Sequence, residues 1–140
     1  MQKFCALLLI FSSIFLVICG VFINSTTYLD KYNGRYEVYL LSSSSNAKIL
    51  QVDKRSASLF ISKRGEAIFL ENSILSPNEI FDSLSAKQVF IEETEEGISY
   101  YGFSNKIKFK KMINGKVINV HVFKSERGIK IGLPIIYGSF

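Results

Sequence analysis

The feature that most constrains this chain is the run Phe4–Ile23, twenty residues that carry no charge and are mainly apolar. An α-helix rises 1.5 Å per residue, so about twenty apolar residues are needed to cross a hydrocarbon core of ~30 Å. Lys3 precedes the run, and positive charge beside a membrane span favours the inner side. The sequence therefore predicts an N-terminal helix that addresses the rest of the chain to the outer side of a membrane.

Two fates of this helix stay open. It is either an uncleaved anchor or a signal peptide cut after Gly20 or after Ser25. An anchor predicts a single-pass protein of the cell membrane with its C-terminal domain outside, and a cut signal predicts a secreted domain. A buried core helix is disfavoured, because a uniformly apolar helix needs protein on all sides. The expected division is residues 1–24 as anchor or signal, 25–34 as an unstructured polar connector near the membrane, and 35–140 as the extracytoplasmic domain.

Charge and cysteine usage limit the functions of that domain. The chain has a net charge of +5 from 17 basic and 12 acidic residues, of which only Lys3 precedes residue 25. This mild excess is smaller than in dedicated nucleic-acid binders, so we expect no nucleic-acid partner. Cys5 and Cys19 both lie in the apolar run, so the domain has no disulfide, thiolate nucleophile or cysteine metal site. A cysteine-free exported domain fits the cell envelope of a Gram-positive bacterium.

Short alternating segments dominate the domain. In its first half the pattern predicts four strands, at 35–41, 48–52, 58–62 and 67–70, joined by polar loops at 42–46 and 53–55. Strands this short, separated by tight turns, are typical of an antiparallel meander.

One helix is expected, of about ten residues, because Ser76 is a good N-cap, Pro77 suits the first helical position and Glu79 completes a capping box. Its apolar stripe, which includes Ile80 and Phe81, predicts that it packs on one face of the sheet.

The second half of the domain predicts further strands at 88–92, 98–103 and 129–131, and a hairpin at Asn114-Gly115, the strongest signal for a type I′ turn. The register of that hairpin pairs Ile113 with Lys116, Phe109 with Val120, and Ile107 with Val122. It gathers on the solvated face Lys106, Lys108, Lys110, Asn119 and His121. Pro134 indicates that the last strand lies at an edge or carries a bulge. The expected fold is α+β, a mainly antiparallel sheet of about seven to nine short strands with one packed helix.

Residues that could carry chemistry are isolated. Ser45 and Lys48 have the Ser-x-x-Lys spacing of penicillin-binding enzymes, but they fall in a loop and no Lys-Thr-Gly element follows. His121 is the only histidine and has no partner in the pattern for a triad or a metal site. The carboxylates of residues 92–96 lack the Asp/Asn/Gly alternation of calcium loops. We therefore predict no catalytic set, no metal site and no cofactor.

The best functional lead is the lysine row Lys106, Lys108 and Lys110. Such a row binds an anionic partner, or alternatively discourages aggregation of an open sheet.

Three segments of the last 40 residues, 100–104, 114–120 and 132–140, resemble the carboxyl-terminal part of small exported proteins of spore-forming Gram-positive bacteria, the YwmB group. The resemblance implies an extracytoplasmic location and an α+β sheet, and it implies no site residue.

The function expected from the sequence is a non-catalytic binding or accessory module of the cell envelope, whose partner is an anionic envelope polymer or a protein. The alternatives are a small envelope hydrolase, with a site made of carboxylates alone, and a structural subunit of a membrane complex.

Overall fold

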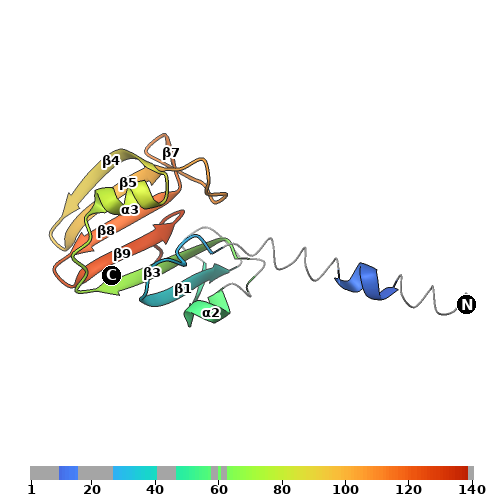
Figure 1. Cartoon of the computed structure of the whole chain (residues 1–140). Coiled ribbons are helices and arrows are strands. Elements are labelled where there is room, and N and C mark those ends of the chain that lie inside the picture. The colour runs from blue at the N-terminus through green and yellow to red at the C-terminus, as the bar shows by residue number, and fades with distance from the viewer. Residues whose placement is uncertain (1–9, 16–26, 41–46, 58–59, 61–62, 139–140) are drawn as a thin grey trace, which may run out of the picture.

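The computed structural model describes residues 10–15, 27–40, 47–57, 60 and 63–138, and a seven-stranded antiparallel sheet dominates it (Figure 1). The order across the sheet is β2-β1-β3-β9-β8-β5-β4. The seven strands are β1 (Arg35–Leu40), β2 (Lys48–Val52), β3 (Gly65–Glu71), β4 (Lys87–Thr94), β5 (Gly97–Phe103), β8 (Val120–Ser125) and β9 (Gly128–Leu133). A separate hairpin joins β6 (Lys111–Ile113) to β7 (Lys116–Ile118), and two short helices are α2 (Lys54–Ala57) and α3 (Pro77–Ser83). The predicted α+β class with a mainly antiparallel sheet is confirmed.

One face of the sheet carries the main core. Alternate residues of the central strands, such as Ile68 on β3 and Ile131 on β9, point to this face and are fully buried. Helix α3 lies over it (Figure 1) and contributes Ile80 and Phe81. The predicted capping box is present, with the Ser76 amide donating to the Glu79 carboxylate at 2.7 Å. The helix is shorter than expected, because it ends at Ser83 and the chain turns through Ser85 with a φ of 51°.

Residues 27–34, which belong to the segment expected to be an unstructured connector, pack against the same face as α3. Leu29 is fully buried, and Tyr32 is 9% exposed. The Tyr32 hydroxyl lies 2.5 Å from Ser83 Oγ, and the Lys31 ammonium donates to the Ser83 carbonyl. The expectation of an unstructured connector is wrong for these residues, which form part of the layer that covers the core.

The strand order differs from a meander. Strand β1 lies between β2 and β3, with Tyr39 opposite Ile49 on one side and Gly65 on the other. Strand β9 lies in the centre rather than at an edge, because Pro134 comes after its last residue and removes no donor from the ladder.

The first half of the domain also contains a helix where a turn was expected. Residues 54–57 form α2, because the Asp53 carboxylate accepts the Ser56 amide at 3.0 Å and so acts as an N-cap. The loop predicted at 42–46 lies outside the described residues, and so does all but residue 60 of the strand predicted at 58–62.

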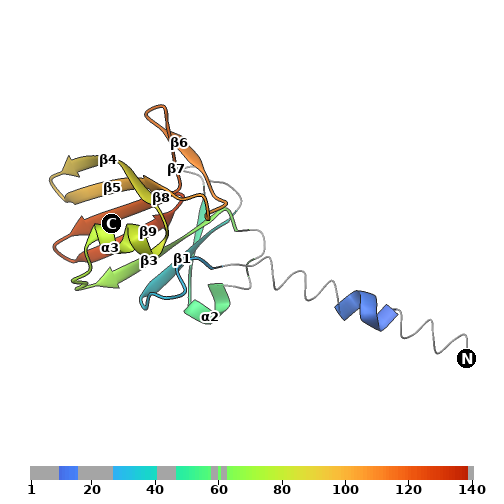
Figure 2. The same ribbon diagram turned by 45° about the horizontal axis from the view of Figure 1, so that its top comes forward.

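The Asn114-Gly115 turn is confirmed, since Ile113 pairs with Lys116 and both turn residues have positive φ. The longer register, with Phe109 opposite Val120 and Ile107 opposite Val122, is wrong. The hairpin is short and stands off one corner of the sheet (Figure 2), and the chain then re-enters the sheet as β8, which pairs with β5 and β9.

The hairpin is shorter than expected because of Asn119. This residue was expected on the solvated face but is fully buried. Its amide nitrogen donates to the Ser104 carbonyl at 2.7 Å and to the Ile107 carbonyl at 3.1 Å, and its oxygen accepts the Ser104 amide. These bonds hold residues 104–110 as a loop instead of a strand.

Of the apolar run Phe4–Ile23, the structure describes residues 10–15, a short helix with exposed side chains. Within the described ranges, no helix has both the length and the apolar character to cross a membrane.

Candidate functional site

The two ends of the sheet differ in charge. Antiparallel register brings Leu40, Gly65, Leu133, Val120 and Phe103 to one end. Six exposed cations gather at or just beyond these strand ends, and we call this the basic end: Lys48, Arg64, Lys87, Lys106, Lys108 and Lys110.

The opposite end, here called the far end, carries charges of both signs, with more acids than cations among the side chains that the structure describes. The exposed acidic residues described there are Asp53, Glu71, Glu93, Glu95, Glu96 and Glu126, and the exposed cations are Arg35, Lys54, Lys124 and Arg127. The charges that appear evenly distributed along the sequence are therefore segregated along the strand direction.

The predicted lysine row lies on the loop 104–110 rather than on a strand. All three lysines are exposed, because the intervening Ile107 and Phe109 point into the core. The loop is held at its start by the Lys106 ammonium, which donates to Ser85 Oγ at 2.8 Å, and near its end by Lys110, 5.7 Å from the Phe103 ring. The alternation expected from the sequence is present, although the strand is not.

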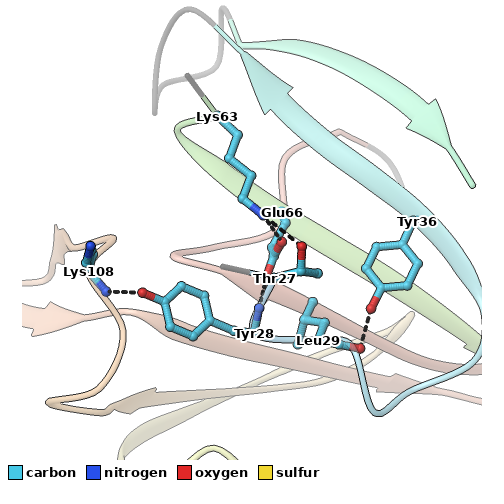
Figure 3. A network of polar contacts seen from close by, with 7 residues as sticks. All are labelled: Thr27, Tyr28, Leu29, Tyr36, Lys63, Glu66 and Lys108. Carbon is cyan, nitrogen blue, oxygen red and sulfur yellow. Dashed lines mark hydrogen bonds and ion pairs between the residues drawn. The ribbon is translucent and has the colours of Figure 1, made fainter. Parts of the chain in front are cut away.

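This loop contacts the beginning of the folded domain. The Tyr28 hydroxyl accepts the Lys108 amide at 3.3 Å (Figure 3). The Tyr28 ring also meets Phe109 edge to face at 5.9 Å. The chain therefore enters the domain beside the lysine loop, at the basic end.

A buried ion pair fixes this entry point. Figure 3 shows Lys63 and the Thr27–Tyr28 segment meeting at the Glu66 carboxylate. The Lys63 ammonium donates to Glu66 Oε2 at 2.7 Å and to Thr27 Oγ1 at 3.2 Å, and the Tyr28 amide donates to Glu66 Oε1 at 2.7 Å. A charge-assisted network of this kind holds its members in one geometry. We refer to Thr27, Tyr28, Lys63 and Glu66 as the clamp.

The clamp is deeply buried, with Glu66 fully inaccessible and Lys63 8% exposed. Burial raises the pKa of the Glu66 carboxyl, while the Lys63 ammonium and the amides of Tyr28 and Leu29 act in the opposite direction. The hydrogen bond from the Tyr36 hydroxyl to the Leu29 carbonyl continues the network along the entering segment.

The expected register placed His121 on the solvated face beside Lys108. In the structure His121 is only 4% exposed and lies on the other face of the sheet. The Ile136 amide donates to His121 Nδ1 at 3.2 Å, so Nε2 carries the proton and donates to Ser99 Oγ at 3.0 Å. The ring stacks on Tyr101 at 4.4 Å. Burial lowers the pKa of His121 to about 3. A neutral imidazole that donates to the serine hydroxyl is not arranged to remove its proton, so this pair has a structural geometry.

Four carboxylates that a hydrolytic site could use, Asp53, Asp82, Glu92 and Glu93, are not brought together. Asp53 caps α2, Asp82 lies on α3, and Glu92 and Glu93 lie on the edge strand β4, and all four are exposed. Glu92 instead accepts from the Tyr101 hydroxyl and from the Asn114 amide. Within the described ranges no group of three His, Cys, Asp or Glu side chains fits a metal ion. Ser45 lies outside those ranges, and Lys48 begins β2.

A groove of about 520 Å³ opens toward the far end on the face opposite α3. Its floor holds the ion pair between Lys130 and Glu37, 3.1 Å apart, and Phe69, over which Arg35 stacks at 4.9 Å. The lining carries groups of both charges, and its Lys130 and Glu37 already bind one another.

Sequence reasoning missed Lys48, Arg64 and Lys87, because only the strand order shows that they share an end with the lysine loop. It also missed the clamp, although a lone glutamate in the apolar stretch 65–70 is a detectable sign of a buried charge. Comparison of this chain with protein-family models, curated proteins and solved structures found no significant match.

Proposed function

We propose that this chain is a non-catalytic binding module of the cell envelope, held outside the membrane by Phe4–Ile23, which binds an anionic partner through Lys106, Lys108 and Lys110. The observation that carries the proposal is the exposure of these three lysines on one ordered loop, within a cluster of six exposed cations. Positive charge concentrated on one end of a small domain attracts polyanions far more strongly than the same charge spread evenly.

The order of the loop also supports binding. Buried Ile107, the Asn119 bonds and the contact with Tyr28 hold the backbone that carries the lysines. A fixed backbone leaves only side-chain freedom to be lost on binding. The carboxylates do not converge in the described part of the chain, so no observation there favours the hydrolase alternative.

The test is binding of a soluble polyanion, fluorescent dextran sulfate, to the full chain in neutral lipid nanodiscs over a salt series. Replacing Lys106, Lys108 and Lys110 with Gln is expected to weaken binding at least tenfold and to flatten the dependence on salt. The matched control replaces Lys54, Lys124 and Arg127 at the far end, which removes the same charge, and is expected to bind almost as the native chain does. Equal losses in the two triple variants would refute the lysine loop as the site.

A further inference from the structure

We propose that the anionic partner of the basic end is the lipid head-group layer of the same membrane that holds Phe4–Ile23, so that the domain docks with its basic end on the bilayer and its far end pointing away. This inference rests on the proposed function and names the partner of that site.

The first argument is the length of the tether. Three residues, 24–26, separate Ile23, the end of the apolar run, from Thr27, the first residue of the clamp. The four Cα-to-Cα steps from Ile23 to Thr27 span at most about 14 Å when fully extended. Electrostatic attraction to the head groups acts over about 8 Å at physiological ionic strength. The tether therefore keeps the entry point of the domain within a few ångströms of the distance over which the head-group charge acts.

The second argument is the rigidity of the entry point. Thr27 and Tyr28 are bonded to Lys63 and Glu66, and Leu29 is fully buried. The chain therefore gains no further free length after residue 27. With a long flexible linker any face of the domain could reach the bilayer, whereas a tether of three residues restricts contact to surfaces around the entry point.

The third argument is that the surface around the entry point is the basic end. The Lys108 amide donates to the hydroxyl of Tyr28, a residue of the entry point. Arg64 directly follows Lys63 of the clamp in the sequence. Among the described side chains, acids outnumber cations at the far end. An anionic bilayer attracts the basic end and repels the far end. Both effects favour the orientation in which the basic end faces the bilayer.

Lipid recognition needs these features together, while a free wall polymer or an acidic protein needs only the lysines. The short tether, the clamp and the segregated charges thus favour the bilayer as the occupant. The other two classes of partner become outcomes of the test.

The experiment measures which end of the domain lies on the membrane. The full chain, with Cys5 and Cys19 replaced by Ala, receives one cysteine for a fluorophore, either Asn105→Cys at the basic end or Glu126→Cys at the far end. Both positions are exposed. The chain is placed in nanodiscs of phosphatidylcholine alone or with phosphatidylglycerol, and the discs contain a lipid that carries a quencher on its head group.

With phosphatidylglycerol, we expect strong quenching at residue 105 and weak quenching at residue 126, and in neutral discs a smaller difference between them. Each lysine near an anionic surface contributes about fivefold to such an equilibrium, so Gln at 106, 108 and 110 should lower the ratio of docked to undocked domain roughly a hundredfold. The far-end triple variant should keep the native pattern. Circular dichroism of each variant confirms that the domain is folded.

Three results would overturn the inference: equal quenching at the two positions in anionic discs, no effect of phosphatidylglycerol, or release of the native chain from the membrane by cleavage. The proposed function is judged separately by dextran sulfate binding in neutral discs. If the lysine variant loses dextran sulfate but the lipid has no effect, the module binds a free polyanion, such as a wall polymer, and only the lipid inference fails.

Discussion

His121 illustrates how the surroundings of one residue decide whether its chemistry is available. The imidazole is packed between strands, accepts one backbone amide and donates to Ser99, and its ring stacks on Tyr101. The Tyr101 ring in turn stacks on Phe90 at 4.4 Å. Each ring atom that could act on a substrate is therefore committed to holding β4, β5, β8 and the C-terminal segment together.

This burial predicts a loss of stability in acid. Burial lowers the pKa of His121 from 6.5 to about 3, so the unfolded chain binds a proton at a higher pH than the folded chain does. The free energy of unfolding should be unaffected by this residue above pH 6.5 and should fall by about 5 kcal/mol as the pH drops from 6.5 to 3. Because His121 is the only histidine, its ring resonances can be followed by NMR without ambiguity, and they should not titrate above pH 4.

The matched control is His121→Gln, which keeps a donor and an acceptor but has no proton to gain. Burial raises the pKa of Glu66, so that carboxyl contributes in the opposite direction, with stability falling as the pH rises through its folded value. Glu66 is present in both chains and cancels in the comparison. A difference in stability between the native chain and the Gln variant that is constant with pH would contradict the prediction.

At the scale of elements, the segment 27–32 behaves as a covering layer although it has no regular secondary structure. Its hold on the sheet depends on the clamp, in which two opposite charges are buried together. Removing one partner of a buried pair leaves an uncompensated charge, which typically costs about 3–5 kcal/mol, whereas removing both costs much less.

We therefore expect Glu66→Gln to lower the free energy of unfolding by about 3 kcal/mol and to speed hydrogen exchange at the amides of Tyr28 and Leu29. The double variant Glu66→Gln, Lys63→Met should recover most of the stability, because no charge is left buried. Thermal unfolding of the full chain in neutral detergent measures the first effect, and exchange mass spectrometry measures the second. A single variant as stable as the double one would show that the clamp does not hold the segment.

The elements that could be predicted are those fixed by neighbouring residues. The capping box at Ser76 and the turn at Asn114-Gly115 involve residues within three positions of one another, and both were predicted correctly. The hairpin register failed because one buried side chain, Asn119, bonds to Ser104, fifteen positions away. A pattern of alternating residues cannot show where a long-range bond ends a strand.

The same distinction explains the connector. Residues 25–34 are mostly polar, which favours a linker. The partners that hold Tyr28 and Tyr32 on the sheet, Glu66 and Ser83, are 38 and 51 positions away from them. The lysine loop was identified because its charges are local. Its contact with Tyr28 spans 80 positions and required the fold.

For the whole molecule, the class of fold followed from composition and alternation, but the strand order and the charge segregation did not. The order β2-β1-β3-β9-β8-β5-β4 depends on pairings such as β3 with β9, which join residues about sixty positions apart. Only that order shows that cations from four separate parts of the sequence meet at one end. The orientation proposed above accordingly depends on the assembled sheet and not on any one segment of the sequence.

This polarity leads to a prediction that separates orientation from net charge. Replacing Glu93, Glu95 and Glu96 with Lys makes the domain more basic and gives the far end its own excess of cations. If only net charge mattered, quenching at residue 105 in anionic discs would increase. We expect it to decrease, because the far end now competes for the bilayer, and quenching at residue 126 should rise. Three added lysines shift the balance between the two ends roughly a hundredfold.

Gln at the same three positions removes the repulsion without adding attraction, so it should give an intermediate result. An increase at residue 105 in the Lys variant would mean that the segregation of charge has no part in docking.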